Sequence, residues 1–492
     1  MITKENQEDI VEYISDASNM KGHADKVYFP ESYSEMQYAI KECCENNIPF
    51  TVSASRTGLT GACVPLSGTL ISVQRMNRII NIDEVRKIVT VEPGVTLAEL
   101  DDALRERGFL YPPNPTERDS SIGGNVNTNA SGSRTFKYGP TRDYVQSLKI
   151  ILADGTDLQI ERGQFLTKDG LLEIKGKDDQ TLFSIPIVDI DMPKIKNASG
   201  YYLKDETDAI DLFIGSEGTL GVVAEIGLRY IDQPEKLLGG IVWFDDFERM
   251  LDFADELRSI SQSRNSINYK EIDKICARII EYFDHNSLKW LKEDDSRIPD
   301  KAVAGLWFEQ EYSELHEDNI LNDWLQFIGK YTNLSDDTRI ALNREEHNKL
   351  RDFRHALPLK VFERMRENKQ LKISTDSAVP EEHFNDFCRF IHQQSAASGF
   401  HYVVYGHIAN CHLHANFFVT TPSDRDRALE IYDKLIDKAL EYGGTVSAEH
   451  GIGKLKKKYL LQMYGKEKLE YMKSIKRILD PNNILGQSTV FD

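Results

Sequence analysis

Three segments rich in glycine and small polar residues interrupt the first half of the chain and limit the folds that it can adopt. They are 53–65 (SASRTGLTGACVP), 120–143 (SSIGGNVNTNASGSRTFKYGPTRD) and 214–223 (IGSEGTLGVV). Such loops leave backbone N–H groups uncovered, so they can cradle a pyrophosphate without a cation. One such loop is more often only a turn, but three in one domain favour a nucleotide-type cofactor. No GxGxxG sequence opens a helix after the first strand, which argues against a Rossmann fold and NAD.

Length and charge exclude several classes of protein. A chain of 492 residues is too long for one core and should form two or three domains. The net charge of −19 argues against nucleic acid as a partner and against a strongly anionic membrane surface. No run of 18 apolar residues occurs, and the first residues lack the basic-then-apolar pattern of a secretory signal. Six scattered cysteines without metal spacing indicate free thiols in a reducing cytosol.

The apolar patterns alternate between helix and strand and predict an α+β fold rather than a regular βαβ sheet. Thr96 and Glu99 form the capping box of a helix. Residues 145–160 read as a hairpin that turns at an Asp-Gly pair, and LFIG (212–215) reads as a strand. We expect a polar helical arm over 1–27, a first domain over 28–232 and a second domain over 233–492.

Histidines gather in the second half of the chain, in YGHIANCHLHANFFV (405–419). This stretch reads as strand, turn, strand, so that His412, His414 and Asn416 share one face and His407 lies at the turn. Glu449, on a separate glycine-flanked turn, could add a carboxylate. Two imidazoles and one carboxylate with an open position suit a catalytic zinc or a similar divalent ion. The same residues could also be satisfied polar groups in a hairpin, and the residues alone leave both alternatives open.

A resemblance extends over much of the first half. It rests on PESYSEMQYAIKECCENNIPFTVSASRTGLTGACVP (30–65), PPNPTERDSSIGGNVNTNASG (112–132), YGPTRDYV (138–145) and GSEGTLGVVAEIGLRY (215–230). In this order the segments resemble the FAD-binding domain of the FAD-linked oxidase superfamily, the vanillyl-alcohol-oxidase-like flavoproteins. The resemblance implies a two-subdomain PCMH-type FAD-binding domain, followed by an α+β cap domain for the substrate and a C-terminal helical segment.

The resemblance also implies which residues contact the cofactor. FAD should be bound non-covalently, because 53–62 contains neither the histidine nor the cysteine that tethers FAD in some members. The first loop contains less glycine than is common in relatives. The positions that match the family's FAD contacts are Ser55, Arg56, Thr57, Gly58, Leu59, Thr60, Gly61, Pro115, Thr116, Gly123, Gly124, Asn129, Ala130, Gly132, Ser199, Gly200, Val222 and Val223.

A second resemblance concerns the histidine-rich part. GHIANCHLHAN (406–416) is similar to the GHxGDGNxHxN signature, and SAEHGIG (447–453) to the EHGxG signature, of the metal-containing 2-hydroxy-acid dehydrogenases. That group includes D-lactate dehydrogenase, the glycolate oxidase flavin subunit and D-2-hydroxyglutarate dehydrogenase. Asn410, Cys411 and His412 stand where the signature has Asp, Gly and Asn. The resemblance implies metal ligands at His407, His414 and Glu449, a substrate contact at Asn416 and the catalytic base at His450.

Two further positions concern the substrate. KLRDFRHALPL (349–359) resembles the family's LWxxRxxxP helix, which implies that Arg354 pairs with the substrate carboxylate. A guanidinium group suits that role because it meets both oxygens, although a surface arginine is the simpler alternative. In STDSAVP (374–380), Ser374 stands where relatives that use dicarboxylates carry a lysine. Lys372 lies two residues earlier and could compensate.

Together these features predict FAD-dependent oxidation of a small D-2-hydroxy acid to the 2-oxo acid, with hydride transfer to flavin N5. Alternatives are the flavin subunit of a glycolate oxidase-type complex and a metal-independent alcohol or carbohydrate oxidase of the same fold. A metal-binding or structural protein without catalysis is disfavoured. The electron acceptor stays open among quinone, cytochrome, electron-transfer flavoprotein and oxygen. We expect a cytoplasmic protein, with a peripheral membrane position and a homodimer left open.

Overall fold

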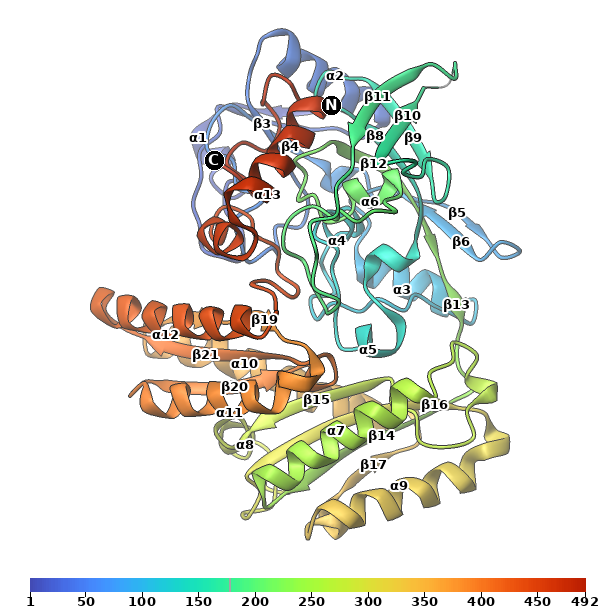
Figure 1. Cartoon of the computed structure of the whole chain (residues 1–492), viewed down its shortest axis with the longest axis vertical. Coiled ribbons are helices and arrows are strands. Elements are labelled where there is room, and N and C mark those ends of the chain that lie inside the picture. The colour runs from blue at the N-terminus through green and yellow to red at the C-terminus, as the bar shows by residue number, and fades with distance from the viewer. Residues whose placement is uncertain (177) are drawn as a thin grey trace. The chain divides into compact units, whose positions relative to one another are not determined.

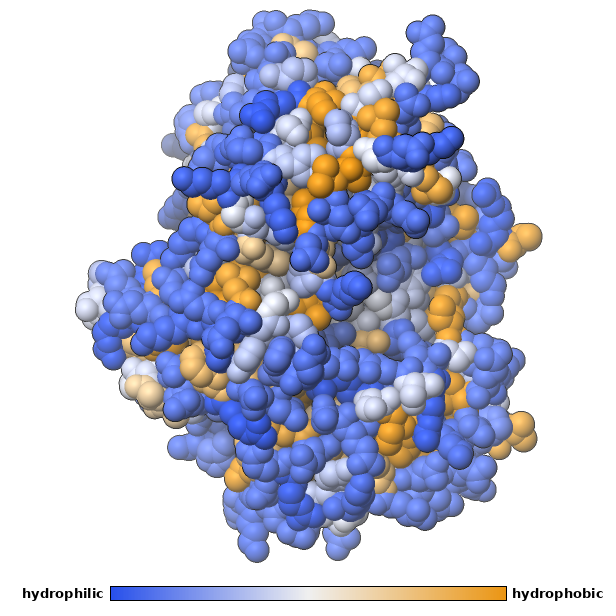
Figure 2. All heavy atoms as spheres, viewed as in Figure 1, coloured by the Kyte–Doolittle hydropathy of each residue, from blue (hydrophilic) through white to orange (hydrophobic). Residues whose placement is uncertain are grey.

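A computed structural model describes residues 1–176 and 178–492, and these form two compact units (Figure 1). Unit 1 contains Met1–Gly132, Gly139–Gln233 and Ser447–Asp492, and unit 2 contains Ser133–Tyr138 and Pro234–Val446. The last segment therefore belongs with the first half of the chain, whereas we expected all of 233–492 to form one domain. Within the described ranges, no helix has both the length and the hydropathy needed to span a bilayer. Hydrophilic side chains predominate on the face shown in Figure 2.

The first sheet of unit 1 has the order β1 (Ile2–Lys4), β2 (Lys26–Phe29), β4 (Thr69–Ser72) and β3 (Phe50–Ser53). Strands β2, β4 and β3 are parallel, and α2 (Tyr33–Glu45) buries Met36 and Ile40 in the adjoining core. The expected helical arm over 1–27 is wrong, since only α1 (Gln7–Ile10) is helical there. The physical reason is pairing: β1 hydrogen-bonds to β2, and Ile10 is buried against the same sheet.

The second sheet of unit 1 is antiparallel, with the order β5 (Ile79–Asp83), β6 (Ile88–Val91), β12 (Val222–Arg229), β8 (Val145–Ile151) and β9 (Asp157–Glu161). Strands β8 and β9 form the expected hairpin, and the capping box at Thr96 is present on α3 (Leu97–Arg105). The strand expected over 212–215 is wrong. Asp208 caps a short helix there by accepting a hydrogen bond from Ile210 N.

The remaining elements of unit 1 are β7 (Phe109–Leu110), α4 (Ile122–Asn127), β10 (Leu171–Lys175), β11 (Thr181–Pro186), α6 (Ala209–Phe213), β13 (Ile231–Asp232) and α13 (Lys457–Leu479). Those of unit 2 are α5 (Thr135–Tyr138), β14 (Lys236–Phe244), α7 (Phe247–Ser263), β15 (Ile279–Asp284), α8 (His285–Leu291), β16 (Ala304–Tyr312), α9 (Glu317–Tyr331), β17 (Arg339–Ala341), α10 (Arg344–Glu367), β18 (Leu371–Ser374), β19 (Ser377–Ala378), α11 (Glu381–Ala397), β20 (His401–Gly406), β21 (His412–Val419) and α12 (Pro422–Glu441).

Unit 2 is built on an antiparallel sheet of eight strands with the order β17-β14-β16-β15-β20-β21-β18, to which β19 adds by pairing with β21. Alternate residues of β14 point to opposite faces, as the period of a strand requires. Val242 and Phe244 enter a core with α7, α9, α11 and α12. Ile241 and Trp243 enter a second core with α8 and α10. Helices therefore cover both faces of the sheet (Figure 1).

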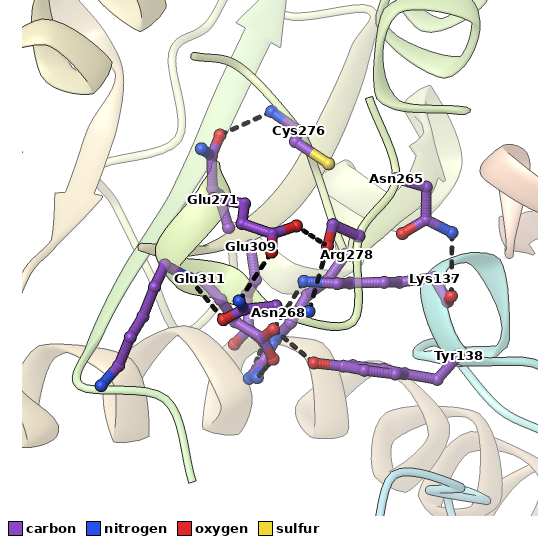
Figure 3. A network of polar contacts seen from close by, with 12 residues as sticks. Lys137, Tyr138, Asn265, Asn268, Glu271, Cys276, Arg278, Glu309 and Glu311 are labelled. Atoms are coloured by element: carbon purple, nitrogen blue, oxygen red, sulfur yellow. Dashed lines mark hydrogen bonds and ion pairs between the residues drawn. The ribbon is translucent and has the colours of Figure 1, made fainter. Parts of the chain in front are cut away.

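A buried network of charges holds the short segment Ser133–Tyr138 within unit 2 (Figure 3). Lys137 Nζ lies 2.7 Å from Glu311 Oε2, and Arg278 Nη1 lies 2.6 Å from Glu311 Oε1. Arg278 also pairs with Glu309 at 2.6 Å, and the Tyr138 hydroxyl donates to Glu311. Burial alone would raise the pKa of both glutamates, but the neighbouring Arg278 outweighs it and holds each pKa at about 2.

Candidate functional site

The hairpin β20–β21 positions the histidines of unit 2. A 3-10 turn at Ile408–Asn410 joins the two strands and leaves His407 at the end of β20. His412, His414 and Asn416 alternate along β21 and share the face of the sheet on which α10 packs, and all three are buried. The expected arrangement of strand, turn and strand is therefore confirmed.

Cys411 occupies an unusual position in this turn. Its φ of 54° lies in the left-handed region, where glycine, the signature residue at this position, costs least. Its side chain is buried in the core on the opposite face of the sheet, and this burial raises the pKa of its thiol to about 12. Cys411 is thus an inert packing residue and not a metal ligand.

The three imidazoles of the hairpin lie close together. One ring nitrogen from each of His407, His412 and His414 lies within 4.8 Å of the other two. Their ring centroids are separated by 4.4 Å for His412 and His414, 5.5 Å for His407 and His412, and 6.0 Å for His407 and His414. Such a cluster is the donor set that late divalent metals prefer, so the residues present fit a metal.

Neighbouring acceptors fix the orientation of two of these rings. His407 Nδ1 hydrogen-bonds to Glu281 on β15, and His414 Nδ1 lies 2.8 Å from the carbonyl oxygen of Thr375. Because a carboxylate and a carbonyl only accept, Nδ1 is the protonated nitrogen in both rings, and Nε2 carries the lone pair. This is the arrangement of acceptors typical of metal-binding histidines.

Arg354 lies on α10 and faces the same side of the sheet. Its Nε donates to Glu281 Oε2 at 3.0 Å, and its guanidinium carbon lies 5.4 Å from the centroid of the Tyr405 ring. Burial alone would raise the pKa of Glu281, but the neighbouring His407 and Arg354 outweigh it and lower the pKa to about 2. Glu281 therefore connects the arginine to the first histidine, and the interpretation of Arg354 as a surface residue is wrong.

Among the buried polar atoms on this face that lack a hydrogen-bond partner within the described part of the chain are Nη1 of Arg354 and Oδ1 of Asn416. An unsatisfied buried donor is costly, so its presence indicates a ligand that completes the hydrogen bonds. A guanidinium donor and an amide acceptor on the same face suit a small molecule that has a carboxylate and a hydroxyl group.

Ser374 and Lys372 also lie on this face, at the edge strand β18. Ser374 pairs with Asn416 of β21, and Lys372 pairs with Phe418. The Lys372 ammonium group lies 5.5 Å from the centroid of the Phe362 ring, and burial lowers its pKa. Within residues 1–176 and 178–492, the Lys372 ammonium group forms no ion pair with a carboxylate, whereas Arg354 pairs with Glu281. The strand register therefore puts both residues on the side of Arg354 and the histidines.

Glu449 and His450 belong to unit 1, in a loop that follows Ser447. Glu449 Oε1 accepts a hydrogen bond from Ser131 Oγ at 3.1 Å, and it also forms an ion pair with the ammonium group of Lys196. The loop is fixed by Glu217, whose carboxylate accepts from Ile452 N and Gly453 N at 2.8 Å each. Burial raises the pKa of Glu217 to about 7.

The positions that match FAD contacts all lie in unit 1. Ser55 to Gly61 follow β3, Pro115 and Thr116 precede α4, and Gly123 and Gly124 lie on it. Asn129, Ala130 and Gly132 follow α4, Ser199 and Gly200 lie beside Ser447, and Val222 and Val223 open β12. Arg56 has a φ of 59°, in the left-handed region where glycine costs least.

The glycine-rich segments meet one another within unit 1. Gly215 N donates to Val126 O at 2.9 Å, which joins the second and third segments. Thr60 of the first segment accepts from Lys454 N at 2.9 Å, next to the loop that Glu217 holds. A Cβ atom on Gly132 would lie 2.1 Å from the Asn114 carbonyl oxygen, so only glycine fits there. These loops thus form one connected surface of backbone groups.

Unsatisfied polar atoms occur on this surface too. Ser53 Oγ, Asn125 Nδ2 and Asn127 Oδ1 are buried and have no hydrogen-bond partner among the residues that the structure describes. They belong to the first and second glycine-rich segments and supply both donors and acceptors. The residues present therefore fit a large polar cofactor such as FAD.

Comparison with known proteins decides the family. Residues 24–161 match the family described as FAD binding domain, and residues 244–489 match the family described as FAD linked oxidases, C-terminal domain. The chain belongs to the FAD-linked oxidases. The resemblance noted in the sequence and the expected α+β fold with a PCMH-type domain are thereby confirmed.

Relatives of this FAD-linked oxidase have several names. Glycolate oxidase subunit GlcD of Bacillus subtilis is 29% identical over 477 residues, which are 95% of this chain and 89% of the relative. A D-lactate dehydrogenase of Anaerostipes hadrus is 28% identical over 93% of this chain and 88% of the relative. A D-2-hydroxyglutarate dehydrogenase of Stutzerimonas stutzeri is 26% identical over 94% of this chain and 90% of the relative.

Solved structures share the fold. p-Cresol methylhydroxylase superposes with a TM-score of 0.70 at 16% identity, over all of this chain (100%) and 94% of the other. The 4-ethylphenol oxidase of Gulosibacter chungangensis gives a TM-score of 0.68 at 16% identity, over 99% and 94% of the two chains. At this identity the likeness extends to the fold alone.

Sequence reasoning missed the residues that hold the site residues in place. Glu281, Asp376, Glu217 and Lys196 were not predicted, although each contacts a candidate ligand or its loop. One signal was available for Glu281. It interrupts the apolar run IIEYFD, and a charge in a buried strand is nearly always paired.

Proposed function

We propose that this FAD-linked oxidase oxidises a small D-2-hydroxy acid to the 2-oxo acid, with a divalent ion, zinc or a similar metal, held by His407, His414 and Glu449. The names of the relatives, which concern lactate, glycolate and 2-hydroxyglutarate, support this substrate class. The observation that carries the proposal is the unpartnered Nη1 of buried Arg354 on the sheet face of the histidine cluster. A carboxylate is the partner that such a donor requires.

The residues of the chain would act as follows. Arg354 binds the substrate carboxylate, and its bond to Glu281 keeps the guanidinium group in a fixed orientation. Asn416 Oδ1 accepts a hydrogen bond from the substrate. His450, assigned from the EHGxG signature, accepts the proton of the substrate hydroxyl group. When bound, FAD supplies the acceptor for the hydride of C2, and the divalent ion supplies a Lewis acid that acidifies the hydroxyl group.

The size of the substrate follows from Ser374. A serine cannot supply the charge that a second carboxylate needs, so we infer a preference for monocarboxylates such as lactate or glycolate. The competing interpretation is that Lys372, on the same face, takes over that charge. The two interpretations predict opposite preferences between lactate and 2-hydroxyglutarate.

Anaerobic reduction of the flavin tests the proposed function. The purified protein should show a flavin spectrum that bleaches with D-lactate or D-glycerate and more slowly with the L-enantiomers. A faster reaction with L-lactate would contradict the assigned stereochemistry. Full bleaching after removal of all bound metal would instead favour a metal-independent alcohol oxidase.

A second candidate function, that of a subunit in a larger enzyme complex, is supported by the name of one relative. A relative is named as the subunit of a glycolate oxidase, so the chain could be the flavin subunit of a larger complex. In that case the flavin would still bleach with substrate, but turnover with artificial acceptors would require added partner proteins. Steady-state rates with a soluble dye, compared with the rate of bleaching, separate the two cases.

A further inference from the structure

His412 is the residue of the hairpin to which neither the signature nor the proposed mechanism gives a role. Its side chain is fully buried, and its ring centroid lies 4.4 Å from that of His414. Its Nε2 atom lies 3.2 Å from Oδ1 of Asp376, which is also fully buried. Asp376 precedes β19, a strand that pairs with β21 directly at His412.

Asp376 places a buried carboxylate beside the His412 ring. The contact lacks the geometry of a hydrogen bond, so it does not fix which ring nitrogen carries the proton. His407 and His414 are held by acceptors at Nδ1. Each of the three imidazoles therefore has a different polar neighbour, Glu281, Asp376 or Thr375. Such paired acceptors are typical of histidines that bind metals.

We propose that His412 is a third imidazole ligand of the divalent ion and that Asp376 positions it. The inference rests on the proposed metal site, to which it adds one ligand that the family signature lacks. Three imidazoles and the carboxylate of Glu449 make four protein ligands, which would fill a tetrahedral ion. An ion that also binds the substrate must therefore accept more than four ligands. Nitrogen-rich donors favour zinc, cobalt, nickel or iron over magnesium and manganese.

A simple alternative is that His412 and Asp376 form a buried polar pair without a metal. The two explanations differ in what the loss of the ring removes. A structural pair contributes to stability alone, so its loss would leave the affinity for a metal unchanged. A ligand contributes to affinity, and even the loss of an outer partner of a ligand typically weakens metal binding 10- to 100-fold.

The test uses the full-length flavoprotein, freed of metal by a chelator and titrated with Zn²⁺ or Co²⁺ in competition with a chromophoric chelator. His412→Asn introduces the residue of the signature, and His401→Asn, an exposed residue of β20, is the matched control. We expect His412→Asn to bind Zn²⁺ at least about tenfold more weakly than the wild type and to alter the visible bands of bound Co²⁺. His401→Asn should change neither, and flavin content shows that each variant is folded.

Wild-type affinity and an unchanged Co²⁺ spectrum in His412→Asn would overturn the proposal. Loss of turnover with metal binding intact would also overturn it, because His412 would then act on the substrate. His414→Ala separates a failure of the proposed metal site from a failure of the inference about His412. If His414→Ala loses the metal while His412→Asn keeps it, the proposed function stands and the inference about His412 fails. If the wild-type protein binds no divalent ion, both the proposed metal site and the inference about His412 are overturned. Should His412→Asn not fold, Asp376→Asn decides the matter, with unchanged affinity as the refuting result.

Discussion

Replacing Glu311 by Gln should destabilise unit 2 strongly at neutral pH. The carboxylate is fully buried and contacts Lys137 and Arg278, whose side chains are 1% and 6% exposed (Figure 3). The variant leaves two buried cations with only Glu309 as counter-charge. Removing one partner of a buried ion pair costs about 3–5 kcal/mol. The depression of the Glu311 pKa from 4.5 to about 2 agrees, since it corresponds to roughly 3 kcal/mol.

The pH dependence gives this prediction its sign. The folded-state pKa of Glu311 lies below its value of 4.5 in the unfolded chain, so its contribution is present above pH 4.5 and disappears as the pH falls toward 2. Glutamine resembles the protonated form. The difference in unfolding free energy between the wild type and Glu311→Gln should therefore be largest near pH 7 and shrink steadily below about pH 4.5.

Tryptophan fluorescence during urea unfolding measures this difference in unit 2 alone. The four tryptophans, all of which belong to unit 2, are Trp243, Trp290, Trp307 and Trp324. The control is Glu345→Gln, which breaks an exposed pair with Lys349 and should cost less than about 1 kcal/mol. An unfolding curve of Glu311→Gln that matches the wild type at pH 7, or a difference that is the same at pH 7 and pH 3, would refute the reasoning.

Three other predictions concern the cofactors and the substrate. Replacing His414 by Ala should remove the metal and most turnover while FAD stays bound, as metal analysis and the flavin spectrum would show; a variant that keeps both metal and rate would contradict the assignment. Acid or heat precipitation should release the flavin into the supernatant, because 53–62 contains no histidine or cysteine, and flavin in the pellet would contradict non-covalent binding. The kcat/KM for D-lactate should exceed that for D-2-hydroxyglutarate by about tenfold or more, since a charge-assisted hydrogen bond contributes about 1.5–3 kcal/mol and Ser374 cannot form one. A strong preference for the dicarboxylate that is lost in Lys372→Ala would show that Lys372 supplies the charge.

Local features could be predicted from the sequence because a few neighbouring residues determine them. The capping box at Thr96, the hairpin over 145–160 and the turn between β20 and β21 are of this kind. The strand expected over 212–215 failed because the N-cap at Asp208 outweighs a short apolar run. The arm over 1–27 failed because Ile2–Lys4 finds a pairing strand, which no local pattern reveals.

Long-range contacts account for the rest of what the sequence could not predict. Glu281 meets His407 across 126 positions of the chain, and Glu449 meets Lys196 across 253. Such contacts depend on the order of strands in a sheet, here β15 beside β20, and this order is a property of the whole fold. Ser447–Asp492 belongs to unit 1, and no local sequence pattern predicts this. The family signatures suggested candidate ligands, but they contain none of these partners.

The order of the strands explains how the fold itself keeps the histidine cluster together. Two of the acceptors that orient the rings come from the two sides of the hairpin β20–β21: Glu281 from β15 on one side, and Thr375 from the stretch after β18 on the other. The rings of His407 and His414 are therefore held by segments that the sheet places independently of the hairpin. Three imidazoles free to rotate would lose conformational entropy on binding, whereas rings already held by neighbouring strands lose little. The fixed sheet, rather than the turn that carries the signature, thus holds the histidine cluster in place.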